Sequence, residues 1–149
     1  MYRLFFVVLL LLPSLTFADG WEFRLGVSSF PEQNTLFGAE LTRVYSLTDN
    51  LELGVGGVLR TDFTSTVGPG LVVRLRDWFA QHFAVGAVGE IGYLYHNGFS
   101  NPDSYTYLFV GPLLGMRFSP LFVQWEPGVL FFQGTSQFLP LRFVLGLSF

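Results

Sequence analysis

Residues 141–149 read Leu-Arg-Phe-Val-Leu-Gly-Leu-Ser-Phe, and this stretch decides the fold. Apolar side chains occupy every second position from the first residue to the last, and the residues between them are mostly small or polar. Successive side chains of a β-strand point to opposite faces of its sheet. The period of two therefore predicts a strand with one apolar and one polar face.

The same alternation recurs upstream, and no stretch after residue 18 shows the spacing of an amphipathic helix. The expected strands are residues 21–30, 36–47, 51–62, 67–76, 83–95, 105–118, 121–132 and 141–149. The pattern is clean except in residues 105–118, where it blurs at Gly111-Pro112 and a β-bulge is expected.

The connections between these segments fall into two sets that alternate along the chain. Short turns are expected at residues 48–50, 77–82 and 119–120, and longer loops at residues 31–35, 63–66, 96–104 and 133–140. Alternation of this kind favours antiparallel neighbours, with the short turns at one end of the sheet and the longer loops at the other.

The first eighteen residues have a different character. One arginine at position 3 precedes the unbroken apolar run 4–12, and small residues follow at Thr16 and Ala18. This order is typical of an export signal cleaved after Ala18, and the run is too short for a spanning helix. The chain is then divided into a cleaved signal, residues 1–18, and one domain, residues 19–149. The alternative is a buried N-terminal strand or an uncleaved anchor.

Composition narrows the class of protein. Half of the 149 residues are hydrophobic, only 13% are charged, and all eight basic residues are arginine. The absence of cysteine excludes disulfides, thiolate metal sites and cysteine nucleophiles. With a net charge of −3 and two histidines, we expect no nucleic-acid partner, no metal and no cofactor.

An alternating sheet closed into a barrel can turn its apolar face inward, as soluble barrels do, or outward to lipid. Here the apolar face is bulky, whereas the polar face is rich in glycine, serine and threonine, which suits the narrow interior of eight strands. Most segments also reach the 9–11 residues that a spanning strand needs. The sequence therefore predicts an all-β, eight-stranded antiparallel up-and-down transmembrane β-barrel.

Charges of both signs occupy the face predicted to line the interior. The expected ion network comprises Glu22, Arg24, Glu40, Glu52, Arg60, Arg74, Arg76, Glu90, Arg117, Glu126 and Arg142. Buried charges must be paired, and arginine suits multidentate pairing better than lysine. Arg43 is an exception, because it falls on the apolar face near the 48–50 turn, from where it could reach lipid headgroups.

Aromatic residues gather near the segment ends, where two girdles are expected at the membrane interfaces. One group flanks the longest loop: Tyr93, Tyr95, Tyr105 and Tyr107. The other lies at the short-turn end: Tyr45, Trp78, Phe79, Phe83 and Phe122.

The alternation that ends in an aromatic residue resembles the terminal signature of bacterial outer-membrane barrels. It runs through Leu141, Phe143, Leu145, Leu147 and Phe149. With the signal segment and eight strands, the whole mature chain resembles the small OmpA/OmpX-type barrels. The resemblance implies a bacterial outer-membrane location, contacts with outer-membrane lipids and lipopolysaccharide, and reading of the terminal strand by the barrel-assembly machinery. It also implies a monomer.

The resemblance leaves three functions open, because barrels of this type do different work. The first is a structural or surface-interaction role, with both termini periplasmic and no enzymatic activity. The second is a lipid A-modifying hydrolase, with His96, Ser100, Glu90 and Asp103 as candidate catalytic residues near one rim. The deacylases of this architecture carry His-x-Ser-Asn, whereas this chain has His-x3-Ser-Asn. The third is a narrow pore or a carrier of a small ligand.

Overall fold

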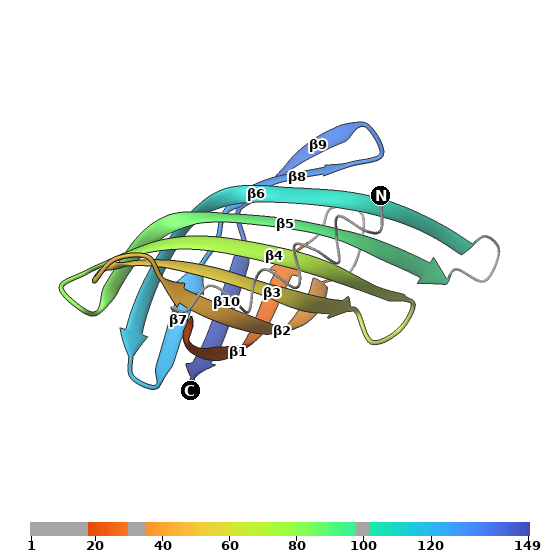
Figure 1. The fold of residues 1–149 in the computed structure, drawn as a ribbon. Helices are drawn as coiled ribbons and strands as arrows, with labels where there is room; N and C mark the ends of the chain where they lie inside the picture. The colour runs from red at the N-terminus through yellow and green to blue at the C-terminus, as the bar shows by residue number, and fades with distance from the viewer. Residues whose placement is uncertain (1–17, 30–34, 98–101) are drawn as a thin grey trace, which may run out of the picture.

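The computed structural model describes residues 18–29, 35–97 and 102–149, and every regular element in them is a β-strand (Figure 1). The predicted signal therefore lies outside the described residues except for Ala18, which begins the first strand. The strands are β1 Ala18–Ser29, β2 Thr35–Ser46, β3 Leu51–Thr61, β4 Thr66–Phe79, β5 Phe83–Asn97, β6 Pro102–Phe118, β7 Leu121–Trp125, β8 Gly128–Phe132, β9 Thr135–Leu139 and β10 Arg142–Ser148. No helix of the described residues is long and apolar enough to cross a membrane.

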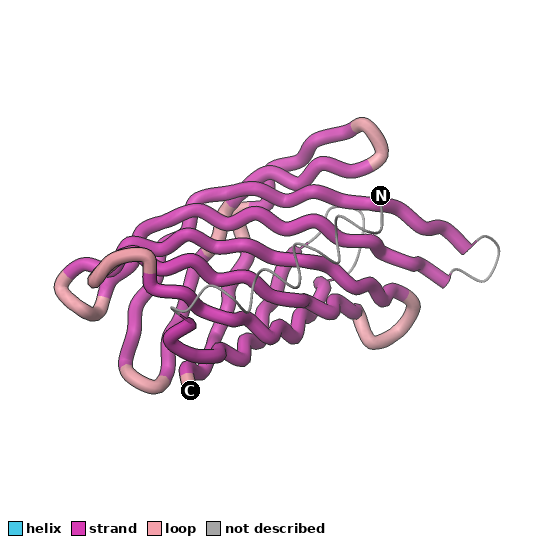
Figure 2. Tube along the Cα trace, viewed as in Figure 1, coloured by secondary structure: helices cyan, strands magenta, loops and turns pink. Residues whose placement is uncertain are grey.

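All neighbouring strands pair antiparallel, and the sheet closes on itself (Figures 1 and 2). Each strand from β1 to β6 pairs with the next, β7 and β8 both pair with β6, and β10 joins β7 to β1. β7 and β8 together form the seventh strand of the wall, and β9 and β10 form the eighth. The predicted eight-stranded antiparallel barrel is confirmed.

The eighth strand differs from its prediction. Residues 133–140 were expected to form a loop, but β9 pairs with β8 from Gly128↔Leu139 to Phe132↔Thr135. The turn between them is only two residues long, since Gln133 and Gly134 both adopt positive φ, 47° and 77°. The wall is also interrupted after β7, because Pro127 has no N–H to continue the ladder. The β8–β9 hairpin rises away from the wall above β6 (Figure 1).

The expected bulge at Gly111-Pro112 is absent. β5 and β6 pair without a register shift from Phe83↔Met116 to Asn97↔Pro102, and the alternation of faces continues through residues 105–118. The pattern blurs in the sequence because apolar side chains stand on both faces of β6. Tyr107 and Phe109 are buried inside, whereas Leu108 and Val110 are exposed outside.

The two faces of the wall are arranged as predicted. Apolar side chains on alternate positions of every long strand are exposed, for example Leu25, Val73, Ile91 and Leu145. The charged residues on the other parity are buried in the interior. This is the reverse of a soluble barrel, whose apolar face would be the buried one.

The predicted aromatic girdles are only half right. Tyr93, Tyr95, Phe79 and Phe83 are exposed on the outer face, and the rings of Phe79 and Phe83 stack 5.9 Å apart. The other members of the predicted girdles are buried: Tyr45, Trp78, Tyr105, Tyr107 and Phe122. Four of these residues lie on the inward parity, which aromatic character alone could not reveal.

Interior glycines explain how such large rings fit inside a small barrel. A Cβ atom built on Gly146 would lie 2.0 Å from Cζ of Phe122, and one on Gly92 would lie 2.5 Å from the Tyr107 hydroxyl. Real atoms never approach so closely. Glycine is therefore required at these positions because its register partner on the neighbouring strand carries a ring.

Candidate functional site: the charged interior

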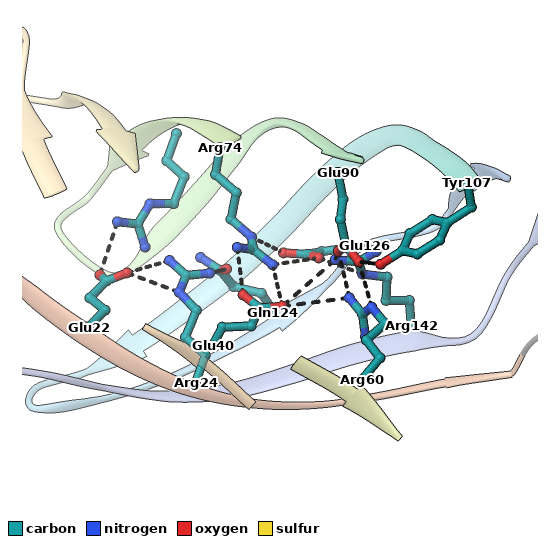
Figure 3. A network of polar contacts seen from close by, with 11 residues as sticks. Glu22, Arg24, Glu40, Arg60, Arg74, Glu90, Tyr107, Gln124, Glu126 and Arg142 are labelled. Atoms are coloured by element: carbon teal, nitrogen blue, oxygen red, sulfur yellow. Dashed lines mark hydrogen bonds and ion pairs between the residues drawn. The ribbon is translucent and has the colours of Figure 1, made fainter. Parts of the chain in front are cut away.

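The charged residues of the interior come from almost every strand of the wall. The period of two turns each of them inward from its own strand, and eight strands leave only enough space for them to meet in the middle. Every member of the predicted network forms at least one ion pair in the structure, and the pairs fall into two clusters. Figure 3 shows most of these residues.

The larger cluster is a closed ring in which arginines and glutamates alternate. Its members in order are Arg60, Glu90, Arg142, Glu126, Arg74 and Glu40. Three arginines and three glutamates give the ring a formal charge of zero. We call this set the central ring (Figure 3).

The first half of the central ring is held by Glu90. Nε and Nη2 of Arg60 donate to its two oxygens at 2.5 and 2.6 Å, and Nη2 of Arg142 donates to the second oxygen. The hydroxyl of Tyr107 donates to the first oxygen at 2.5 Å. Glu90 thus accepts hydrogen bonds from three side chains, two of them charged.

The second half passes through Glu126 and Arg74. Nε of Arg142 lies 2.9 Å from Glu126, and Nε of Arg74 lies 2.5 Å from the other oxygen of the same carboxylate. Nη1 of Arg74 contacts Glu40 at 2.7 Å, and Glu40 returns to Arg60 at 3.7 Å. Each cation of the ring therefore faces at least two carboxylates, which offsets the cost of removing it from water.

The smaller cluster lies nearer the short-turn end. Glu22 pairs with Arg24 and, at 3.0 Å, with Arg76, which also lies 2.9 Å from Glu52. Glu52 in turn contacts Arg117 at 3.3 Å. Three arginines against two glutamates leave this cluster with a formal charge of +1. The side chains of Arg117 and Glu52 are 27% and 16% exposed, so this cluster meets the solvent.

Aromatic rings lie against the guanidinium groups of both clusters. Arg142 lies 4.2 Å from the centroid of Phe109, and Arg117 lies 3.9 Å from the centroid of Trp78. A ring face attracts a cation and excludes water from it, which strengthens the ion pairs on the other side of the group.

An apolar layer covers the central ring on the side of the longer loops. Its buried members are Leu36, Val72, Val88, Leu94, Tyr105, Tyr107, Phe109, Leu130 and Leu139. Tyr107 belongs to both layers, since its ring packs in the apolar cluster and its hydroxyl binds Glu90. The interior is therefore filled by an apolar layer, the central ring and the smaller cluster in turn.

Two of the candidate catalytic residues that the structure describes, His96 and Glu90, lie far apart. Nδ1 of His96 lies 2.9 Å from Oγ1 of Thr66, while Glu90 is held in the central ring. Six residues of extended strand separate His96 from Glu90, a distance of roughly 20 Å. Asp103 is the register partner of His96 on β6, and Ser100 lies outside the described residues. In the part of the chain that the structure describes, no group of His, Asp and Glu could hold a metal ion.

The predicted assembly signal lies on the closing strand of the barrel. Its apolar side chains, Leu141, Phe143, Leu145, Leu147 and Phe149, are all exposed on the outer face. β10 pairs with β1 from Glu22↔Ser148 to Ser28↔Arg142, and the backbones of Trp21 and Phe149 exchange hydrogen bonds of 2.8 and 2.9 Å. The two ends of the described barrel therefore meet at the short-turn end.

Sequence reasoning missed the uncharged partners of the network. Gln124 accepts a hydrogen bond of 2.6 Å from Nη1 of Arg24, and Tyr107 donates to Glu90. A signal for both was present, because Gln124 shares the parity of Glu126, and Tyr107 shares the parity of Arg117. Each lies an even number of residues from an inward-facing charged residue on the same strand or its continuation, and this spacing predicts that both side chains point into the interior.

The comparisons with known proteins address the fold. No known protein family matches the sequence, and no curated protein matches it. The fold is similar to the crystal structure of the N-terminal β-barrel domain of Pseudomonas aeruginosa OprF, with a TM-score of 0.66 over 90% of this chain and 100% of that chain. The two barrels share one fold. The expected resemblance to the small outer-membrane barrels is thereby confirmed for the architecture, and at 15% identity it carries no activity.

Proposed function

We propose that this protein is a small β-barrel of a bacterial outer membrane with a structural or surface-interaction role and a closed interior. The inside-out distribution of side chains supports the location, because an exterior of exposed leucine, valine and phenylalanine suits hydrocarbon and not water. The fold of the OprF barrel domain, an architecture of outer membranes, agrees with it. In this proposal residues 1–18 are a cleaved export signal and both termini are periplasmic.

The central ring is the observation that favours a structural role over a pore. Its six members are at most 1% exposed and carry no net charge, so an ion entering the interior would meet neither water nor an unpaired charge. A conducting interior needs binding groups that are free to exchange ligands. Neither does the geometry favour the hydrolase, since Glu90 is too far from His96 to orient it.

The same proposal assigns partners. Outer-membrane lipids and lipopolysaccharide would contact the apolar exterior, and the barrel-assembly machinery would read the exposed side chains of the closing strand, ending at Phe149. The protein would act as a monomer, because the wall closes within one chain. Surface contacts would involve the projecting β8–β9 hairpin, where Phe138 is exposed.

Two measurements test this proposal. We expect the protein in the outer-membrane fraction of expressing cells, with a gel mobility that shifts on heating because a closed barrel resists detergent until heated. We also expect no discrete conductance when the folded protein is added to planar bilayers. A soluble periplasmic protein without a heat shift would refute the location, and stepwise single-channel currents would refute the closed interior.

A further inference from the structure

Arg43 differs from the other arginines of the described residues. Each of the rest pairs with a carboxylate, whereas no carboxylate in the described part of the chain lies within ion-pair distance of Arg43. It stands on the outward parity of β2, between the exposed Leu41 and the strand end at Ser46. A cation on an apolar outer face requires a nearby anion, and the described side chains supply none.

The position of Arg43 suits an anion at a membrane interface. Three residues separate it from the end of β2, roughly 10 Å along the strand, which a long side chain can bridge toward the headgroups. Its guanidinium lies 5.0 Å from the ring centroid of Trp21, its register partner on β1. The ring restrains the guanidinium group while leaving its N–H donors free to bind an anion.

An apolar groove adjoins Arg43 on the side toward the middle of the barrel. Its volume is about 430 Å³, and its outward-facing lining residues are Phe23, Ala39, Leu41, Gly57, Leu59 and Pro69. The groove exists because Ala39 and Gly57 are small where the wall otherwise carries large side chains. Gly57 is the register partner of Leu41, and Val55, two residues away, is the partner of Arg43. Arg43 therefore stands one outward position beyond Leu41, the lining residue nearest to it on β2.

We propose that Arg43, Trp21 and this groove form a binding site for one phospholipid of the leaflet at the short-turn end. The guanidinium binds the headgroup phosphate through paired N–H donors, and an acyl chain lies in the groove. The apolar groove favours a lipid over free phosphate, because an inorganic ion would leave it unfilled. This inference rests on the proposed membrane location.

Native mass spectrometry of the folded barrel with phosphatidylglycerol tests the site. We expect one lipid to remain bound as detergent is stripped, and Arg43→Gln to weaken its retention about tenfold, the effect of losing one charge-assisted contact. Gly57→Leu should weaken retention as well, because the new side chain fills the groove while Arg43 remains. Inorganic phosphate at the same concentration should not displace the lipid.

Two matched controls separate this site from general effects. Gly89 is a second outward glycine, with open space around it, so Gly89→Leu should leave retention unchanged. Arg117→Gln removes the half-exposed arginine of the interior mouth and should also have no effect. Loss of the lipid in Arg117→Gln but not in Arg43→Gln would overturn the proposal, as would equal effects of Gly57→Leu and Gly89→Leu.

The same samples distinguish failure of this site from failure of the proposed function. Each variant is first inserted into phosphatidylglycerol vesicles and checked for heat-shifted gel mobility. A wild-type protein that does not insert contradicts the membrane location. A wild-type protein that inserts but retains no lipid contradicts the lipid site alone.

Discussion

At the scale of single residues, Glu90 shows how a charge is held in the interior. One carboxylate accepts hydrogen bonds from Arg60, Arg142 and Tyr107, and it is fully buried. A buried charge loses its hydration and must regain an equivalent interaction from its neighbours. Arg60 and Arg142 depend on the Glu90 carboxylate in the same way, because both guanidinium groups are buried away from water.

Neutralising this carboxylate should destabilise the barrel strongly. Glu90→Gln leaves Arg60 and Arg142 with less compensating charge, and we expect a loss of about 3–5 kcal/mol in the free energy of unfolding from vesicles in urea. Glu52→Gln is the control, since Glu52 is partly exposed and its partners can be hydrated. Equal losses in the two variants would contradict the role given to burial.

Asp62, in the turn after β3, is a second carboxylate that is stabilised by the hydrogen bonds it accepts, here outside the wall of the barrel. Its carboxylate accepts hydrogen bonds of 2.8–2.9 Å from the backbone N–H groups of Thr64, Ser65 and Thr66. Burial alone would raise the pKa of this carboxyl, but the three amides and the Ser65 hydroxyl outweigh it and hold the pKa well below its usual range. The conformation of this turn is therefore stabilised by the ionised form of Asp62.

The pH dependence of this turn follows from the sign of the shift. A lowered pKa in the folded state adds stability above the ordinary aspartate value, about 3.9, and this stability is lost only as the pH falls toward the folded value. NMR titration of the barrel in micelles should find Asp62 still ionised at pH of about 3.9. A midpoint at or above that pH would show that the amides do not bind the carboxylate.

At the scale of elements, the interruption between β7 and β8 shows how an irregular backbone is satisfied. Pro127 and Pro140 break the two strands of the last hairpin, and Nε1 of Trp125 donates to the carbonyl of Pro140 at 2.8 Å. In the proposed membrane location this carbonyl would have no water to bind, and the outward indole N–H would take the place of that water.

Removing the indole N–H of Trp125 should lower the stability of the barrel without affecting the central ring. For Trp125→Phe we expect the free energy of unfolding to fall by about 1–3 kcal/mol, the cost of leaving a desolvated acceptor unpaired. Phe143→Leu, a change in a nearby outward ring that donates no hydrogen bond, serves as the control for lost apolar contact. A smaller loss in Trp125→Phe than in this control would contradict the assignment.

The elements also show what sequence could predict. Alternation identified most of the strands, their antiparallel order and the inward orientation of every member of the ion network, because a period of two is a property of the backbone itself. It could not identify β9, whose Thr-Ser-Gln sequence reads as a loop and whose pairing depends on a two-residue turn at Gly134. It also misplaced Tyr105 and Tyr107, since an aromatic side chain suits the lipid interface and the packed interior equally well.

At the scale of the whole molecule, the interior is filled by buried side chains, although its centre is charged. Rings and glycines from neighbouring strands occupy the space jointly, so the composition of one strand is fixed by the next. Sequence analysis found the charged part of this core but not its aromatic part, because the register of β10 on β7 brings Gly146 against Phe122 and alternation alone does not fix that register.

This packing can be tested with two glycines of opposite orientation. Gly146→Ala places a methyl group inside the Phe122 ring, and we expect a much smaller heat-modifiable folded fraction after refolding into micelles. Gly89→Ala adds the same group to open space on the exterior and should refold like the wild type. Comparable folded fractions would mean that the interior rings can move aside.

The cyclic form of the central ring has a consequence for how such sequences diverge. In a linear chain of alternating charges, a residue at the end can be lost with one partner, but a closed cycle has no end. A substitution that removes the charge of one member leaves its two neighbours, which carry the same sign, facing one another; the members are Arg60, Arg74, Arg142, Glu40, Glu90 and Glu126. In related sequences these six positions should therefore change together. Either two paired residues exchange their charges, or an adjacent arginine and glutamate are lost jointly.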